Sequence, residues 1–250
     1  MDAIIINNLH KKFRLGHENA GSIKSLLVSF GRSKYEDLHA LKGISFSVHA
    51  GETVAIIGRN GSGKSTLLGI MSRIYKPTSG KVEINGKVSP LLDLGAGFHP
   101  DLTGIENIYL NGSILGLSRR EITKRMDQIV SFAELEHFID APIRTYSNGM
   151  IMRLGFSIAV QVDPDILLVD EVLAVGDEAF QQKCYDKVRE FQQLGKTIIF
   201  VSHDLKAVRE VATRVIWLDS GNIRADDGVE AVLNAYLQES AWNEDHPHAI

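Results

Sequence analysis

Hydrophobic residues along the chain occur in short continuous runs that are separated by longer stretches of mixed polarity. A short apolar run between turn signals is typical of a buried strand, and strict alternation is typical of a half-buried one. The runs that predict strands are AIII at 3–6, ISFSV at 44–48, TVAIIG at 53–58, ILLVD at 166–170 and TIIFVS at 197–202. Apolar strands that alternate with helices indicate an α/β fold with a largely parallel sheet.

Helical patterns fill most of the intervals between these strands. Apolar residues at helical spacing predict helices over 65–74, about 178–194 and about 228–239. The region of about 103–160 is helical throughout, so we expect a helical insertion that interrupts the sheet. Beyond the last helix, the polar residues 241–250 are expected to form a tail.

Two segments have the pattern of β-hairpins. KVEINGKV at 81–88 has a central Asn-Gly pair, which is a strong signal for a tight turn between strands. VIWLDSGNIRA at 215–225 has the same form, with Ser-Gly between two runs. Both segments are therefore predicted to be hairpins.

A polar segment spans residues 14–42, between the first two predicted strands. Within it, SIKSLLVSF at 22–30 has apolar residues at helical spacing and Ser22 as its N-cap residue. A helix that packs on the protein's own core is the favoured interpretation. A helix at the cytoplasmic membrane surface, or against a partner, is the alternative.

Composition and charge exclude several classes of protein. Hydrophobic residues make up 44% and charged residues 23% of the chain, which is ordinary for a globular protein. The formal net charge of −4, from 27 Lys+Arg and 31 Asp+Glu, argues against a nucleic-acid partner bound by a broad basic face. The single cysteine, Cys184, excludes an internal disulfide and suits a reducing compartment. The N-terminus does not have the pattern of a signal peptide, and no stretch is apolar enough to predict a membrane-spanning helix.

The strongest chemical signal is GRNGSGKS at 58–65, which follows a predicted strand and precedes a predicted helix. Such a loop binds nucleotide phosphates because its glycines let backbone N–H groups converge on the phosphate oxygens. Lys64 is expected to reach the β- and γ-phosphates, and Ser65 is expected to coordinate Mg²⁺. The predicted nucleotide-binding residues are Gly58, Arg59, Asn60, Gly61, Ser62, Gly63, Lys64, Ser65 and Thr66.

Polar residues also follow two other predicted strands. Asp170 ends the strand ILLVD, where a carboxylate can hold Mg²⁺, and Glu171 follows at once. A strand-end carboxylate beside a γ-phosphate can orient or deprotonate an attacking water, so Glu171 is the predicted catalytic base. His203 comes just after TIIFVS. Because parallel strands end at one edge of a sheet, its imidazole is predicted to hydrogen-bond the γ-phosphate there.

Taken together, Gly58–Thr66, Ser147–Gly149, Ile166–Glu171 and His203 resemble, in order and spacing, the ATPase subunit of an ABC transporter. The resemblance extends from about residue 3 to about residue 240. It implies a P-loop NTPase fold with a mostly parallel core sheet, an antiparallel β part and a helical subdomain. It also implies hydrolysis of ATP, with ATP and Mg²⁺ as cofactors and Lys64, Glu171 and His203 as catalytic residues.

The resemblance gives a role to Tyr146-Ser147-Asn148-Gly149-Met150. In this family the corresponding signature motif is usually Leu-Ser-Gly-Gly-Gln, so Asn148 and Met150 depart from the pattern. The resemblance implies that Ser147, Asn148 and Gly149 grip the γ-phosphate of ATP bound by the opposite subunit. One chain would then hold half of each active site, and hydrolysis would require a head-to-tail homodimer.

Three further roles follow from the resemblance. The family usually has a Gln in the loop before the helical insertion; this chain has none there, and Asp93 is the candidate ligand of the metal or its water. Phe13 is the candidate for the aromatic residue that stacks on adenine, with Tyr35 as an alternative and core packing as the other role for Phe13. The segment AVGD at 174–177 resembles the dimer-contacting loop of the family, with Asp177 as its polar member.

Several segments, among them TYSNGM and DEVLAVGDEAFQQKC, resemble the ATPases that export bacterial cell-surface polysaccharides, such as O-antigen and teichoic acid. This resemblance implies a polytopic membrane permease as partner, a lipid-linked polysaccharide as transported substrate, and a peripheral location at the cytoplasmic face of the inner membrane. We expect no C-terminal carbohydrate-binding domain of the kind that some such ATPases carry. The alternatives are an exporter of lipids or drugs, and a soluble ABC ATPase outside transport.

Overall fold

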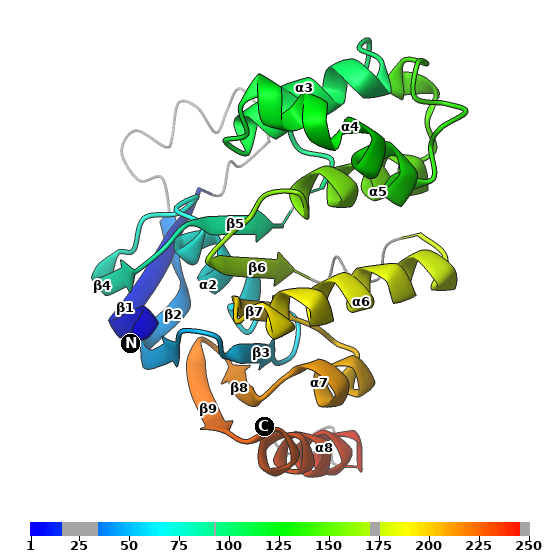
Figure 1. The fold of residues 1–250 in the computed structure, drawn as a ribbon. Coiled ribbons are helices and arrows are strands. Elements are labelled where there is room, and N and C mark those ends of the chain that lie inside the picture. Colours follow the sequence, from blue (N-terminus) through cyan, green and yellow to red (C-terminus); the bar gives the residue numbers. More distant parts are fainter. Residues whose placement is uncertain (17–34, 93, 171–175, 246–250) are drawn as a thin grey trace, which may run out of the picture.

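The computed structural model describes residues 1–16, 35–92, 94–170 and 176–245. Figure 1 shows two sheets that lie together and a group of helices that extends beyond one edge of the larger sheet. This arrangement confirms the predicted α/β fold with a helical insertion. The segment at 22–30, which is predicted to be helical, lies outside the described residues.

The larger sheet has six strands in the order β5-β6-β7-β3-β8-β9. All neighbours pair in parallel except β8 and β9, which are antiparallel and form the hairpin predicted near 215–225. The strands are β3 (Thr53–Ile57), β5 (Val88–Leu91), β6 (Ile166–Asp170), β7 (Thr197–Val201), β8 (Arg214–Asp219) and β9 (Asn222–Asp227). The parallel core therefore runs from β5 to β8.

The smaller sheet is antiparallel, in the order β2-β1-β4. Its strands are β1 (Asp2–Gly16), β2 (Tyr35–His49) and β4 (Ser79–Ile84). Because β1 and β2 are long, both ends of the polar segment 14–42 belong to this ladder, in which Phe13 pairs with Leu38. The predicted strands 3–6 and 44–48 are thus only parts of longer strands.

The prediction of a hairpin at 81–88 is wrong. β4 pairs with β1 in the smaller sheet, whereas β5 pairs with β6 in the larger one. The Asn85 N–H donates to the Ala3 carbonyl (2.8 Å) and the Lys87 N–H donates to the Asp165 carboxylate (2.8 Å). These bonds anchor the two sides of the Asn-Gly turn to different sheets, so long-range pairing overrides the local turn signal.

Four helices cover the two faces of the larger sheet. They are α2 (Lys64–Met71), α6 (Glu178–Gln193), α7 (Leu205–Val211) and α8 (Val229–Asp245). The sequence did not predict α7, whose seven residues are too few for a clear periodic pattern. α8 continues into the segment expected to be a tail, because residues 238–245 contain no Gly or Pro and Pro247 follows.

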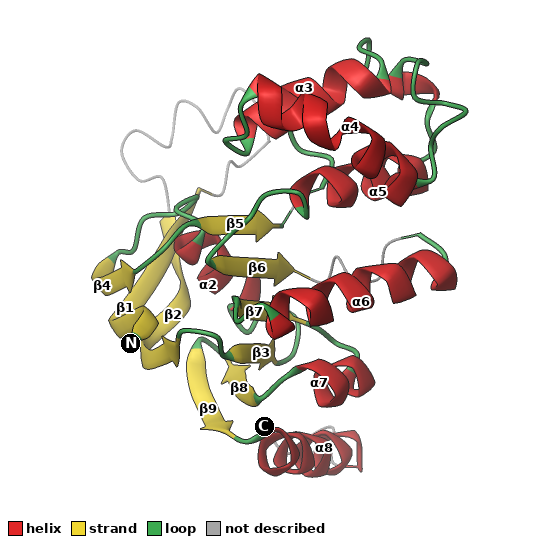
Figure 2. Cartoon of the chain, in the orientation of Figure 1, coloured by secondary structure: helices red, strands yellow, loops and turns green. Residues whose placement is uncertain are grey.

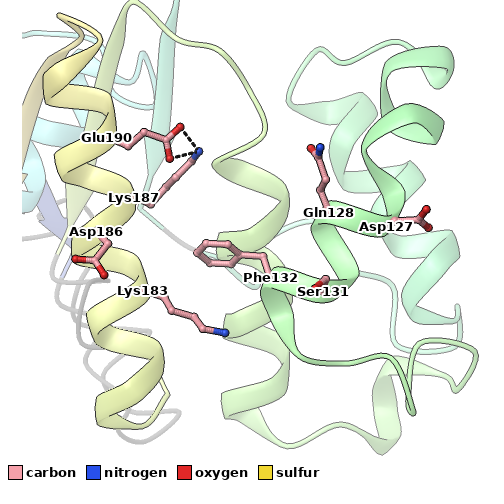
Figure 3. Close-up of a pocket in the computed structure, with 8 residues that line it drawn as sticks. All are labelled: Asp127, Gln128, Ser131, Phe132, Lys183, Asp186, Lys187 and Glu190. Atoms are coloured by element: carbon pink, nitrogen blue, oxygen red, sulfur yellow. Dashed lines mark hydrogen bonds and ion pairs between the residues drawn. The ribbon is translucent and has the colours of Figure 1, made fainter.

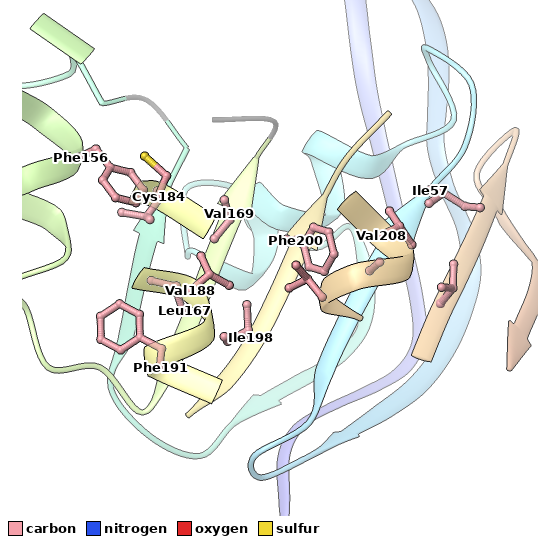
Figure 4. Close-up of a cluster of buried hydrophobic side chains, with 14 of the residues drawn as sticks. Ile57, Phe156, Leu167, Val169, Cys184, Val188, Phe191, Ile198, Phe200 and Val208 are labelled. Atoms are coloured by element: carbon pink, nitrogen blue, oxygen red, sulfur yellow. The ribbon is translucent and has the colours of Figure 1, made fainter. Parts of the chain in front are cut away.

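Side chains that alternate along the strands build separate cores on the two faces. One face of the sheet packs against α2 and the smaller sheet, and the other packs against α6, α7 and α8. Figure 4 shows the second of these cores, in which Phe156 of the helical insertion and Cys184 of α6 are both fully buried. Burial raises the pKa of the Cys184 thiol to about 12, which keeps the thiol protonated.

The helical insertion contains α3 (Gly104–Ile114), α4 (Arg119–Ala133) and α5 (Asn148–Ala159), as Figure 2 shows. α3 and α4 each begin with a capping box, formed by Thr103 with Glu106 and by Ser118 with Glu121. Hydrogen bonds from these caps lower the pKa of both glutamates. The three helices enclose a hydrophobic cluster of their own, so the predicted helical subdomain has an independent core.

Candidate functional site

The predicted phosphate loop connects β3 to α2 in a conformation that only glycine can adopt at key positions. All five residues of β3 are buried. Gly63 ends the loop at φ 108°, and a Cβ atom there would lie 2.6 Å from the Ala40 carbonyl oxygen. A Cβ atom on Gly58 would lie 2.1 Å from the Leu218 carbonyl oxygen. The loop therefore packs closely against the backbones of β2 and β8, and this packing fixes the conformation of the loop.

The start of α2 differs from the starts of the next five helices. α3, α4, α5, α6 and α7 each begin with a Thr, Ser or Asp side chain that accepts a hydrogen bond from the helix. The N-cap of α2 is Gly63, which has no side chain to offer. The first N–H groups of a helix have no intrahelical partner and attract anions. The N-terminus of α2 is thus suited to a phosphate.

Lys64 is held against the loop itself. Only 5% of the residue is exposed, and its Nζ donates to the carbonyl oxygens of Gly58 (2.7 Å) and Arg59 (3.1 Å). An ammonium group held there provides positive charge at the surface where a phosphate would lie. Ser65 follows with an exposed position at the first turn of α2.

A cavity of about 250 Å³ lies beside the loop. Phe13 of β1 and several of the predicted phosphate-binding residues line this cavity. The lining residues are Phe13, Leu38, His39, Ala40, Asn60, Gly61, Gly63, Lys64, Ser65 and Thr66. The Phe13 ring is half-buried, and the side chain of the alternative, Tyr35, lies outside the described part of the chain. Phe13 therefore lines a cavity beside the phosphate loop, and its stacking on adenine stays a prediction.

Asp170 and His203 follow two neighbouring strands that end at the same edge of the sheet. β7 lies between β6 and β3, with Asp170 opposite Val201 and Val201 opposite Ile56 in the ladders. Asp170 at the end of β6 and the exposed His203 just after β7 are thus near the end of β3, where the loop begins. Glu171 and Asp93 lie outside the described residues, so the structure does not describe their side chains.

Ser147 starts α5 and caps it. Its Oγ accepts a hydrogen bond from the Met150 N–H (3.2 Å), and Asn148 is the first residue of the helix. Ser147 and Gly149 line a second cavity of about 460 Å³, together with Glu134, Leu135, Phe138, Met150, Arg153, Gly176 and Asp177. Among the described residues that line the two cavities, none is shared. Ser147 and the phosphate loop thus line two different cavities.

A charged network that the sequence did not predict holds α5 in place. Arg153 donates to Glu134 at the end of α4 (2.8 Å) and to Asp177 before α6 (2.7 Å), and its guanidinium lies 5.0 Å from the Phe180 ring centroid. Asp177 also caps α6 by accepting from the Phe180 N–H (3.0 Å). One sequence feature could have pointed to Arg153, because it is the only ionisable residue in the sequence of α5. Its partners lie 19 and 24 positions away.

Lys183 of α6 completes this network by pairing with Glu134. Figure 3 shows Lys183 and Phe132 on opposite walls of a groove between α6 and α4, with a volume of about 670 Å³. The hydrogen bond from Lys183 is the largest cause that lowers the pKa of Glu134. The Phe180 N–H, followed by Arg153, lowers the pKa of Asp177. Both carboxylates are thus stabilised in their charged form.

Comparisons with known proteins identify the family to which the sequence is similar. The family model described as ABC transporter matches residues 41–174. The O-antigen export system ATP-binding protein RfbB of Klebsiella pneumoniae is 47% identical over 246 residues, which cover 96% of this chain and 100% of that protein. The teichoic acids export ATP-binding protein TagH of Levilactobacillus brevis is 45% identical over 239 residues, 96% of this chain and 66% of that protein.

A solved structure is also similar. It is the dimeric structure of a post-hydrolysis state of the ATP-binding cassette MJ0796 bound to ADP and Pi. The TM-score is 0.73 at 25% identity, and the match covers 90% of this chain and 98% of that one. The likeness supports the arrangement of sheets and helical insertion described above.

The Arg153 network predicts a specific pH dependence of stability. The folded state lowers the pKa of Glu134 and Asp177, so these carboxylates stabilise the fold when they are charged. Their contribution to the free energy of unfolding is present above their ordinary pKa values of 4.5 and 3.8, and it is lost as the pH falls through the lowered values. We therefore expect Arg153→Met to lower the free energy of unfolding at neutral pH and to have a smaller effect at about pH 3. Urea unfolding at both pH values measures this difference.

Arg144→Met is the matched control, because Arg144 pairs with Asp101 (2.6 Å) and both side chains are more than half exposed. Such an exposed pair contributes little, so its loss should change stability little at either pH. An equal loss of stability for Arg153→Met at both pH values would show that packing, rather than charge, explains the role of Arg153.

Proposed function

Because the chain belongs to the ABC transporter family, we propose that it is the ATP-hydrolysing subunit of a bacterial exporter of lipid-linked cell-surface polysaccharide. The observation that supports export of polysaccharide is the similarity to an O-antigen export ATPase over that protein's whole length. The similarity to a teichoic acid export ATPase supports the same substrate class. The substrate would be an O-antigen-like glycan.

The residues around the loop fit ATP and Mg²⁺. Gly58 and Gly63 let the loop pack against the backbones of β8 and β2, which fixes the backbone whose N–H groups would meet the phosphates. Ser65 supplies a hydroxyl oxygen and Asp170 a carboxylate oxygen, which are the ligands that Mg²⁺ prefers. When bound, the metal would neutralise charge on the β- and γ-phosphate oxygens. Asp93 stays a prediction as a further ligand.

The proposed mechanism assigns one task to each remaining residue. Lys64 transfers its hydrogen bonds from the loop carbonyl oxygens to the phosphates and stabilises negative charge in the transition state. Glu171 accepts a proton from the attacking water, and His203 donates a hydrogen bond to the γ-phosphate. Phe13 stacks on the adenine ring from the side of the cavity beside the loop.

The second half of the site is proposed to come from another copy of the chain. Ser147 and Gly149 line a cavity that shares no described lining residue with the cavity beside the phosphate loop. The Ser147 hydroxyl and the N–H groups at the start of α5 are suited to a γ-phosphate. In a head-to-tail homodimer each ATP would lie between the loop of one subunit and Ser147, Asn148 and Gly149 of the other.

A polytopic permease subunit is the proposed membrane partner of the ATPase. In the described parts of the chain, no helix combines the length and the apolar character needed to span a bilayer. A polytopic permease subunit would bind the ATPase at the cytoplasmic face of the inner membrane and move with each cycle of dimer closure and opening. Nucleic acid is not a proposed partner. An exporter of lipids or drugs and a soluble ABC ATPase are the alternatives.

Removal of the catalytic base should trap the dimer. We expect Glu171→Gln to retain ATP binding, to lose turnover, and to form a stable dimer with Mg-ATP that light scattering detects. In that background Ser147→Ala should weaken dimerisation about tenfold or more, because a hydrogen bond to a charged oxygen is lost. Full ATP turnover in Glu171→Gln would remove Glu171 from the mechanism.

Ser118→Ala provides the matched control for Ser147→Ala. Each serine caps a helix of the insertion through its hydroxyl oxygen, so each substitution should cost about 1 kcal/mol of stability. Of these two serines, Ser147 alone is proposed to contact ATP, so the Ser118→Ala variant should dimerise normally. Equal weakening by both substitutions would mean that capping, rather than a phosphate contact, explains the effect.

The export function predicts a stable complex with a membrane protein. The tagged chain, expressed in its native host and extracted with mild detergent, should co-purify with a small polytopic protein and a lipid-linked glycan, which mass spectrometry identifies. A partner that carries a different lipid or a drug would support the alternative exporter. Recovery of the chain without any membrane protein would support the soluble class.

A further inference from the structure

Two residues contact the Phe13 ring from outside the cavity. The Tyr75 ring meets it edge-on, with centroids 5.5 Å apart and an interplanar angle of 85°. The Lys11 Nζ lies 4.7 Å from the Phe13 centroid and 5.7 Å from the Tyr75 centroid. Of these three described residues, only Phe13 lines the cavity beside the phosphate loop. Tyr75 and Lys11 thus support the ring without occupying the space for a ligand.

Tyr75 is itself fixed to the end of α2. Its backbone N–H donates to the Gly69 carbonyl oxygen (3.1 Å). Its ring lies on Gly69 so closely that a Cβ atom there would come within 2.6 Å of Tyr75 Cδ2. A side chain at position 69 would therefore displace the Tyr75 ring. The contact between Gly69 and Tyr75 sets where the edge of that ring meets Phe13.

Lys11 is fixed in the same region. Its Nζ donates to the Lys76 carbonyl oxygen (3.0 Å), which is next to Tyr75 in the sequence. The ammonium therefore lies over two aromatic rings while a backbone carbonyl oxygen holds it, a favourable cation–π arrangement. β1, which carries Lys11 and Phe13, is in this way tied to the segment that follows α2.

These contacts connect both parts of the nucleotide site through one short helix. α2 begins with Lys64 at the phosphate loop and ends at Met71, a length of about 12 Å. Its start forms the phosphate surface, and the segment after its end holds the Phe13 ring. A ring that is held in advance loses less conformational entropy when a base stacks on it.

We propose that Tyr75 and Lys11 are positioning residues that orient Phe13 for stacking on the adenine of ATP. This inference rests on the proposed function, in which Phe13 is the stacking residue. Tyr75 and Lys11 do not touch the nucleotide in this arrangement and act through the Phe13 ring. Their effect should therefore depend on the presence of a base in the ligand.

Calorimetric titration of the full-length chain with Mg-ATP and with Mg-tripolyphosphate tests the proposal. Tyr75→Leu should weaken ATP binding about three- to tenfold, which corresponds to the loss of an edge-to-face aromatic contact. Lys11→Met should weaken it in the same direction. Neither change should alter tripolyphosphate binding, because that ligand has no base. Tyr75→Phe keeps the ring and should restore the affinity for ATP.

The Phe13→Ala variant distinguishes the stacking role of Phe13 from the positioning role of Tyr75. If Phe13→Ala leaves ATP affinity unchanged, the assignment of Phe13 in the proposed function fails. If Phe13→Ala weakens ATP binding but Tyr75→Leu does not, the positioning role alone is overturned. Equal weakening of tripolyphosphate by Tyr75→Leu would also overturn it, since the change would then act on the loop. In the Phe13→Ala background, Tyr75→Leu should cause no further loss.

Discussion

The parallel pairing of β6, β7 and β3 is the constraint on which the site depends. Parallel strands end at one edge of a sheet. This edge therefore gathers Asp170, His203 and the start of the phosphate loop, although they are far apart in the sequence. The loop can take its shape because Gly58 and Gly63 allow close approach of the backbones of β8 and β2. The sheet determines where these residues lie, and the glycines let the loop pack against the neighbouring strands.

A second constraint is the way in which α5 is held. The helical insertion has its own hydrophobic core, and α5 is held to α4 and to the start of α6 by Arg153. Ser147 at the start of α5 therefore lines a cavity that has no described lining residue in common with the cavity beside the phosphate loop. In the proposed homodimer, the Ser147 cavity of one copy would meet the phosphate loop of the other.

Much of this could be predicted from the sequence, for identifiable reasons. The phosphate loop has a strict local pattern between a strand and a helix, and buried parallel strands appear as continuous apolar runs. The prediction of a hairpin at 81–88 failed because of long-range contacts. The Asn85-Gly86 pair has a strong local turn signal, but its flanking strands pair with β1 and β6. The partners of Arg153 and the contact between Phe13 and Tyr75 involve residues far apart in the sequence, so no local pattern indicates them.

The central claim is that ATP joins the phosphate loop of one subunit to Ser147 of another. The most direct measurement is an intersubunit disulfide between Asn60→Cys and Asn148→Cys, carried on separate chains that also contain Glu171→Gln. The native Cys184 is buried and its thiol stays protonated, so it should not interfere. The account predicts a covalent dimer on a non-reducing gel only when both variants are mixed with Mg-ATP. Failure of the mixed variants to cross-link with Mg-ATP, or equal cross-linking without the nucleotide, would contradict it.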